Sequence, residues 1–319
     1  MARMRRLKVV DGEGWYHVYC RTACEKGVYP LEKELCKKKF VSLMKYYARA
    51  YFCNIAAFCV MGNHYHIVLK FEIPRKLSKE ELWERALMLY PKSRKYLKLW
   101  HEKKWETFEA RLFNLSEFMR NMQSAFATWY NKTYKRHGTF WADRFKSVLL
   151  GDEQSVLDCM LYVELNPVRA KICSFPEAYK ASSFYLRSIG EDTWLMRLDK
   201  IVETTVAEYR MALYFRGGIE WSEGEFTTKG TKDTKENKIL IADELPAREK
   251  ERGFETKGLY RRRLRFFVDG MALGSEEFIR QQLEKVKNRG EYTRRVNPIK
   301  QLEGLHVTLR EQRGHAVEF

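Results

Sequence analysis

The sequence predicts an α+β fold with a mainly antiparallel sheet. The expected elements run strand, helix, strand, strand, helix, strand, helix, which is an α+β order. Hydrophobic residues make up 45% of the 319 residues, which is enough for a packed core. Gly62 and Asn63 interrupt a long apolar stretch at a point where a tight turn would join two neighbouring antiparallel strands.

The first quarter of the chain supplies three of these strands and one helix. Residues 14–21 alternate as a strand does, and residues 31–52 place apolar side chains near helical spacing. Residues 53–61 form a nearly unbroken apolar run that suits a buried strand. Residues 64–69 are predicted to form a second strand, which follows the turn and pairs with the strand over residues 53–61.

A charged segment, residues 74–115, is predicted to insert one or two helices after these strands. Ser78 and Glu81 have the spacing of a capping box, which fixes where the first of these helices begins. Another helix is expected over residues 116–134, with Ser116 as its N-cap.

Strand character returns at residues 139–150, and a helix is predicted over residues 153–165. Pro167 ends this helix because the residue before a proline is pushed out of the helical region. Residues 1–190 are therefore expected to form one domain, followed by a helical extension over residues 191–222.

The composition changes after this point. Residues 223–240 are polar and rich in Gly and Thr, which predicts a flexible linker. Residues 241–319 are expected to form a small C-terminal module whose basic, aromatic-rich stretch makes it a candidate contact for nucleic acid. It contains the arginine- and aromatic-rich stretch 258–268 and then a helix capped by Ser275, whose apolar face carries Phe278, Ile279, Leu283 and Val286.

The net charge indicates the class of partner. Lys and Arg number 59 against 42 Asp and Glu, which leaves +17. A basic surface of this size favours a polyanion, although ribosomal, membrane-surface and nucleic-acid-binding proteins all share it. The 8 Trp, 18 Tyr and 19 Phe offer rings on which unpaired bases could stack.

The sequence points to a cytoplasmic protein. No apolar run reaches the ~18 residues of a membrane span, and the basic start, residues 1–6, is not followed by the apolar region of a secretory signal. Seven cysteines are scattered unevenly, which suggests reduced thiols. A zinc site through Cys20, Cys24 and Cys36 is a weakly supported alternative.

Two short motifs carry the chemistry. Side chains alternate along a strand, so His64 and His66 project to the same face and could chelate one divalent ion. Residues four apart share a helix face, so Tyr162 and Asn166 point the same way. The amide oxygen of Asn166 could be a third ligand, which leaves open positions for a phosphate oxygen. The phenol of Tyr162 could then attack phosphorus and form a covalent phosphotyrosine.

These segments match a known family in order and spacing. Its His-hydrophobic-His motif falls on residues 64–66, and its middle segment, with Gly, an aromatic pair and Arg-aromatic-Lys-Ser, falls within residues 130–147. Its Tyr-x-x-x-Asn-Pro-Val helix end falls on residues 162–168. The chain resembles the single-tyrosine HUH transposases of the IS200/IS605 kind, and most closely the REP-associated tyrosine transposases.

The resemblance implies a ferredoxin-like antiparallel sheet with helices on one face, and with the tyrosine helix packed across the histidines. It implies Tyr162 as nucleophile, and Mg²⁺ or Mn²⁺ held by His64, His66 and Asn166. Its substrate would be single-stranded DNA, often near a hairpin or palindromic repeat, and its activity would be DNA transposition. The resemblance says little about the residues beyond 190.

Basic side chains near these motifs are candidate phosphate contacts. Arg144 and Lys146 alternate on one strand face, and Arg169 follows the tyrosine helix. A basic patch beside aromatic residues adds Arg261, Arg262 and Arg263.

Several alternatives remain open at this point. Tyr130 and Tyr134 share a face of the preceding helix and compete for the role of nucleophile. A non-catalytic nucleic-acid-binding regulator would have the same charge and aromatic content. A replication nickase is less well supported, because the sequence has no Gly-Lys-Ser or Gly-Lys-Thr phosphate loop. The protein could be a monomer or a homodimer that shares its active site.

Overall fold

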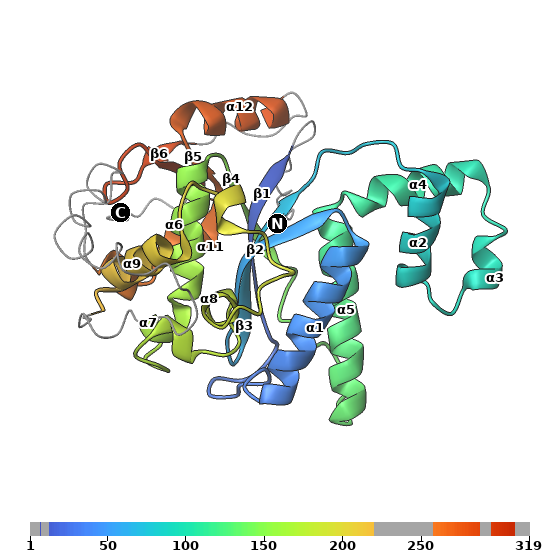
Figure 1. Ribbon diagram of the computed structural model, residues 1–319, viewed down its shortest axis with the longest axis horizontal. Helices are drawn as coiled ribbons and strands as arrows, with labels where there is room; N and C mark the ends of the chain where they lie inside the picture. Colours follow the sequence, from blue (N-terminus) through green and yellow to red (C-terminus); the bar gives the residue numbers. More distant parts are fainter. Residues whose placement is uncertain (1–6, 8–12, 220–257, 288–294, 310–319) are drawn as a thin grey trace, which may run out of the picture.

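The computed structural model describes residue 7 and residues 13–219, 258–287 and 295–309 (Figure 1). These residues build a seven-stranded sheet with the strand order β2-β3-β1-β4-β5-β7-β6. The N-terminal strands are β1 (Gly14–Arg21), β2 (Cys53–Val60), β3 (His64–Phe71) and β4 (Lys146–Leu150). The C-terminal strands are β5 (Gly270–Gly274), β6 (Asn297–Pro298) and β7 (His306–Leu309).

The first four strands confirm the predicted α+β fold and have the ferredoxin-like order. β3 lies between β1 and β2 and pairs antiparallel with both, while β4 pairs antiparallel with the other edge of β1. The helix α1 (Glu34–Ala50) connects β1 to β2, and α5 (Leu115–Thr133) leads into β4. Two parallel strands with an antiparallel strand between them are the core of this topology.

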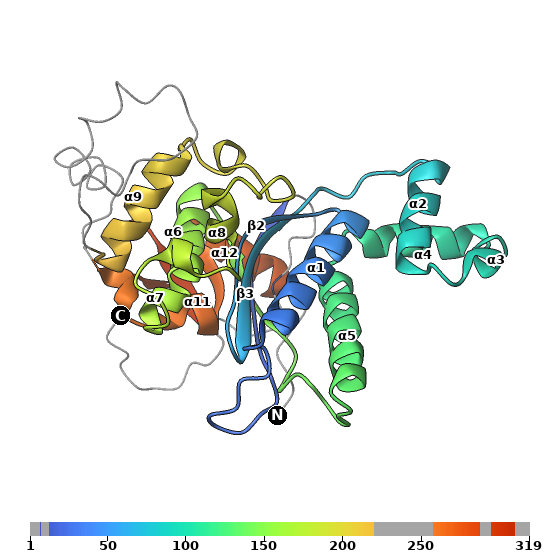
Figure 2. The same ribbon diagram turned by 60° about the horizontal axis from the view of Figure 1, so that its bottom comes forward.

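Helices cover both faces of the sheet, whereas helices on one face were expected (Figures 1 and 2). On the face of α1 and α5, Tyr65 packs against Phe40 and accepts a hydrogen bond from Gln123 at 2.8 Å. On the opposite face, His66 lies against Tyr162. The helices α6 (Glu153–Glu164) and α8 (Ser183–Ser188) cover this second face, and α9 (Val206–Gly217) packs on α6. The short helices η1 (Pro176–Ala178) and η2 (Leu198–Lys200) lie in the connections between them.

The boundaries of α6 follow from its sequence. Asp152 caps the helix, because its carboxylate accepts the backbone N–H of Ser155 at 2.7 Å. After Glu164 the chain forms one more helical turn, α7 (Asn166–Arg169), with Pro167 in its first turn, where a missing N–H costs little. Asn166 and Arg169 are thereby held close to the C-terminal end of α6.

The C-terminal part extends the same sheet. β5 pairs parallel with β4, β7 pairs antiparallel with β5, and β6 pairs with β7. Two short elements precede β5 and pack against α7 and β4, and one helix follows it. These elements are η4 (Leu259–Arg261), α11 (Arg265–Asp269) and α12 (Glu276–Lys287). The predicted linker, residues 223–240, lies outside the described residues.

The insertion forms three helices that project from the body of the molecule (Figure 1). The predicted capping box is present: the Ser78 hydroxyl accepts the N–H of Glu81, whose carboxylate accepts the N–H of Ser78. An aromatic cluster that includes Trp100 and Trp105, with ring centroids 4.9 Å apart, packs the helices together. They are α2 (Lys79–Leu89), the short α3 (Arg94–Leu97) and α4 (Glu102–Leu112).

Two predicted boundaries were wrong. Asn114 caps α5 in place of Ser116, because the Asn114 side chain accepts the N–H of Ser116 at 2.9 Å. The strand predicted over residues 139–150 begins only at Lys146. The residues before it form a loop, which is fastened to α5 where the indole of Trp141 donates a hydrogen bond to a backbone carbonyl.

The seven cysteines are all free thiols. In the part of the chain that the structure describes, no three His, Cys, Asp or Glu side chains gather as a metal site. Cys20, Cys24 and Cys36 therefore do not form the alternative zinc site, and Cys36 instead contacts the Tyr134 hydroxyl at 3.3 Å. Among the same residues, no helix has the length and apolar character needed to cross a membrane.

A buried polar cluster anchors the C-terminal end of α6. Glu164 accepts a hydrogen bond from the Tyr209 hydroxyl at 2.6 Å and also bonds to the Ser183 hydroxyl. Ser183 in turn accepts the backbone N–H of Phe58 in β2 at 2.7 Å. Burial raises the pKa of Glu164 to about 7, against the opposing effect of Arg187 and the two hydroxyls. The cluster ties α6 to β2, α8 and α9.

Glu164→Gln is expected to flatten the pH dependence of stability. The folded-state pKa of about 7 lies above the unfolded value of 4.5, so the wild type loses stability as the pH rises through this interval. The variant has no such proton to release, and the difference amounts to about 3 kcal/mol. Thermal unfolding at pH 5 and pH 8 measures it, with the exposed Glu153→Gln as control. Parallel pH profiles for wild type and Glu164→Gln would contradict this.

Candidate active site

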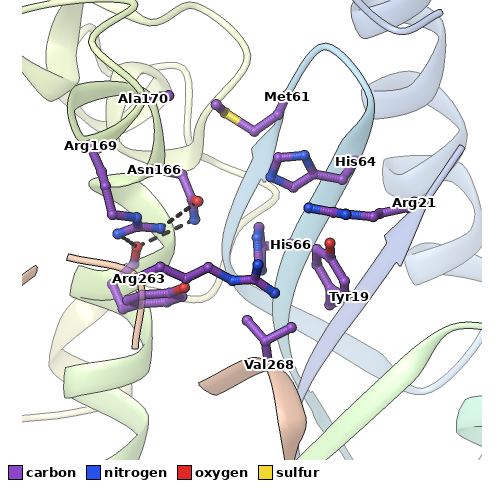
Figure 3. A pocket seen from close by; sticks show the side chains of 11 residues that line it. Tyr19, Arg21, Met61, His64, His66, Asn166, Arg169, Ala170, Arg263 and Val268 are labelled. Carbon is purple, nitrogen blue, oxygen red and sulfur yellow. Dashed lines mark hydrogen bonds between the residues drawn. The ribbon is translucent and has the colours of Figure 1, made fainter. Parts of the chain in front are cut away.

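A hollow of about 250 Å³ opens on the sheet face that α6 covers (Figure 3). The predicted catalytic and metal-binding residues lie together in it, although they come from β3, α6 and α7. Strand β1 and the C-terminal segment complete the walls. The lining side chains are Tyr19, Arg21, Met61, His64, His66, Tyr162, Asn166, Arg169, Ala170, Arg263 and Val268.

His64 and His66 face the hollow from β3, with ring centroids 5.3 Å apart. Each ring has one nitrogen occupied by a neighbour. Nδ1 of His64 lies 2.7 Å from Oδ1 of Asn63, and Nδ1 of His66 lies 2.9 Å from Nε2 of His17. The Nε2 atoms of both rings are thereby left for a ligand.

Both imidazoles are held neutral. Burial lowers the pKa of His64 to about 3, and the positive charges of Arg21 and Arg169 act in the same direction. Burial also lowers the pKa of His66 well below its usual range, with a further contribution from His17. A metal binds the neutral imidazole, so at neutral pH both rings are in the state that ligation requires.

Tyr162 lies on α6 opposite His66, with ring centroids 6.1 Å apart and ring planes nearly perpendicular. The ring is almost fully buried and stacks on Phe267 at 4.4 Å, and the Arg169 guanidinium lies 4.1 Å from its centroid. Burial raises the pKa of Tyr162, while Arg169 and Arg263 lower it. The phenol is therefore protonated at neutral pH, and the positive charges of Arg169 and Arg263 would stabilise a phenolate.

Asn166 follows Tyr162 by one helical turn, in agreement with their spacing. Its amide nitrogen donates to the backbone carbonyls of Tyr162 and Val163, at 3.4 and 3.1 Å. Its amide oxygen accepts a hydrogen bond from Arg169, as Figure 3 shows. An amide oxygen has two lone pairs, so this bond leaves one of them for a further ligand.

The hollow is strongly basic. Arg21, Arg169 and Arg263 line it, and none of the Asp and Glu side chains that the structure describes does. A second hollow of about 180 Å³ shares Tyr19, Arg21 and Arg263 with the first and adds Cys20, Ala142, Asp143, Arg144 and Lys146. Three of the predicted phosphate contacts, Arg144, Lys146 and Arg263, thus lie along one basic path beside the first hollow, in which Lys146 also forms an ion pair with Asp269 at 3.1 Å.

The other predicted arginines are placed differently. Arg261 donates from Nε to the carbonyl of Gly217 at 2.9 Å and joins η4 to the end of α9, and it lines neither hollow. Arg262 is exposed and lines neither hollow. Arg169 lines the first hollow and also donates to the backbone carbonyl of Tyr260 at 3.2 Å.

Local sequence patterns did not indicate the contribution of β1 or of Phe267 in the C-terminal segment. In the β1–β3 pairing, Tyr19 lies opposite His66, and Arg21 lies opposite His64. The alternation of β1 places these side chains on one face, but only the register shows that this is the face of the histidines. The missed residues are His17, Tyr19, Arg21 and Phe267.

The two competing tyrosines lie on the other side of the sheet. Tyr130 and Tyr134 belong to the C-terminal end of α5, which covers the face opposite the hollow. They pack against each other with ring centroids 4.5 Å apart. Neither lines the hollow that contains the two histidines.

Comparison with solved structures finds a likeness to a REP-associated tyrosine transposase bound to a REP hairpin. The TM-score is 0.41 and the sequence identity 13%, and the match covers 65% of this chain and 93% of that one. No protein-family model matches the sequence, and no curated protein matches it. The chemistry of the hollow is therefore inferred from its own residues.

Phe267→Ala is expected to lower the free energy of unfolding by about 3–5 kcal/mol, because it empties a fully buried site against Tyr162. Denaturant unfolding followed by tryptophan fluorescence measures this. The half-buried Phe278→Ala in the same C-terminal part should cost less. A loss below about 1 kcal/mol for Phe267→Ala would mean that the C-terminal segment does not pack on the tyrosine helix.

Proposed function

We propose that the protein cleaves and rejoins single-stranded DNA through a covalent 5′-phosphotyrosine on Tyr162, as a metal-dependent transposase. One observation carries the proposal: two neutral imidazoles, His64 and His66, and a tyrosine share one basic hollow. A phosphodiester suits such a hollow, because arginines attract it while the imidazoles can hold a divalent ion.

The donor set fits a divalent ion. Nε2 of His64, Nε2 of His66 and Oδ1 of Asn166 would hold it, with the remaining positions open to phosphate oxygens. Three neutral donors of this kind accept Mg²⁺ or Mn²⁺, and the nitrogen pair favours Mn²⁺. A bound ion polarises the phosphodiester and neutralises charge on its non-bridging oxygens.

The proposed step exchanges one phosphate ester for another. The phenolic oxygen of Tyr162 loses its proton to solvent, bonds to phosphorus, and displaces the 3′ oxygen of the preceding nucleotide, which leaves as a 3′-hydroxyl after taking up a proton. Arg169 and Arg263 favour the phenolate, since both lower the pKa of Tyr162. The reverse step, with an incoming 3′-hydroxyl, joins strands without an external energy source.

The basic path suggests how the strand is held. Arg144 and Lys146 line the second hollow, and Arg263 lines both. Backbone phosphates on either side of the cleaved bond would lie along these cations, which position DNA without reading its sequence. A hairpin or palindromic repeat beside the cleavage site remains the substrate that the sequence resemblance implies.

Tyr162→Phe is expected to abolish a covalent protein–DNA adduct. Labelled single-stranded hairpin oligonucleotides from DNA that flanks the coding region are incubated with Mn²⁺ and run on a denaturing gel. Wild type and Tyr130→Phe should give the adduct, and Tyr162→Phe should not. An adduct that persists in Tyr162→Phe would assign another nucleophile. Tight binding of DNA without any adduct in wild type would favour a non-catalytic regulator.

The charge of the hollow has a consequence for metal binding. A divalent cation alone would meet three guanidinium groups and no carboxylate from the described residues. A phosphodiester contributes negative charge to the same space, so the ion and the DNA should each favour binding of the other.

Mn²⁺ is therefore expected to raise the affinity for a single-stranded oligonucleotide by about tenfold or more. Fluorescence anisotropy in the Tyr162→Phe background measures this without cleavage. The matched control adds His64→Ala and His66→Ala, which remove the ion's ligands and leave the arginines in place. Equal responses to Mn²⁺ in the two proteins would contradict the proposed coupling.

A further inference from the structure

A third histidine, His17, lies behind His64 and His66 and does not line the hollow. His17 belongs to the middle of β1 and is 1% exposed. In the β1–β3 pairing it lies opposite Val68, two residues along from the pair formed by Tyr19 and His66. Diagonal neighbours of this kind are within reach of each other across two strands.

Both ring nitrogens of His17 have partners. Nδ1 lies 2.6 Å from the backbone carbonyl oxygen of Phe267, and Nε2 lies 2.9 Å from Nδ1 of His66. The planes of the two imidazoles differ by only 9°, with centroids 5.1 Å apart, as expected for rings joined edge to edge through one N–H···N bond.

The carbonyl partner fixes the position of one hydrogen on His17. The carbonyl of Phe267 can only accept, so Nδ1 of His17 carries a hydrogen. A His17 ring that carries only this one hydrogen accepts at Nε2, and the hydrogen between the two rings then belongs to Nδ1 of His66. His66 is left with a lone pair on Nε2, the nitrogen that the proposed metal requires.

We propose that His17 is a positioning residue that holds the ring of His66 in this orientation and tautomer. Metal-binding histidines commonly donate their second N–H to an acceptor that fixes the ring. Here the acceptor is the imidazole of His17, whose other nitrogen is hydrogen-bonded to the backbone carbonyl of Phe267 in the C-terminal segment. The segment around Phe267 thus sets the tautomer of a metal ligand on β3, a sheet strand far away in sequence.

The inference rests on the proposed function only where it takes His66 as a metal ligand. The relay can be tested without metal. Long-range ¹H–¹⁵N spectra of histidine-labelled protein report which ring nitrogen carries the hydrogen. Wild-type His66, assigned with His66→Ala, should show a protonated Nδ1 and a bare Nε2. A hydrogen on Nε2 of His66 would overturn the proposal.

Two variants of His17 separate positioning from general damage. His17→Phe keeps a ring of similar size and removes both bonds, so His66 should lose its single tautomer. His17→Gln offers an amide oxygen to Nδ1 of His66 and should restore it in part. The exposed His101→Phe is the matched control. An unchanged His66 tautomer in both His17 variants would overturn the proposal, and if His17→Phe fails to fold, His17→Gln and the wild type still decide it.

Metal affinity gives a second readout. Ni²⁺ binds imidazole nitrogen more tightly than Mn²⁺ does, so calorimetry with Ni²⁺ can be done without DNA. His17→Phe should lower the affinity by about 10–100-fold, as loss of an outer-shell partner typically does. Affinity equal to that of wild type would overturn the positioning role. If His66→Ala binds Ni²⁺ as well as wild type does, the proposed metal site fails, while the tautomer result still stands.

Discussion

The antiparallel register between β1 and β3 is the constraint on which the hollow depends. It places Tyr19 opposite His66 and Arg21 opposite His64, so one sheet face collects the polar groups of two strands. Tyr65 points the other way and packs under α1 and α5. Because side chains alternate with a period of two, a slip of one residue would exchange the faces and bury the histidines in the wrong layer.

The rotation of α6 is the second constraint, since it decides which side chain meets β3. Polar anchors in the middle and at the C-terminal end of the helix fix it. Asp158 accepts a hydrogen bond from the Tyr260 hydroxyl and lies 3.5 Å from the buried guanidinium of Arg216. Glu164 bonds to hydroxyls of α8 and α9. Buried carboxylates need such partners, so these contacts hold the helix with Tyr162 toward His66.

Local patterns were enough to predict much of this site. The His-x-His alternation and the four-residue spacing of Tyr162 and Asn166 are properties of single elements, and the structure places these residues in one hollow. Contacts between distant segments could not be predicted. The parallel pairing of β4 with β5 joins residues far apart in the sequence, and no local pattern indicates that Phe267 would pack on Tyr162. For the same reason the roles of Arg261 and Arg263 could not be distinguished.

The central claim is that Tyr162 and the two histidines form one metal-dependent site. Paramagnetic broadening by Mn²⁺ tests it directly, because the effect falls steeply with distance and appears even at low occupancy. Protein labelled at the tyrosine ring carbons would be titrated with Mn²⁺, with Tyr162 assigned through Tyr162→Phe. The resonances of Tyr162 and of Tyr19, which also lies beside the two histidines, should broaden first, and that of Tyr130, on the opposite face, should remain sharp. Broadening that spares Tyr162, or that persists after His64→Ala and His66→Ala, would contradict the account.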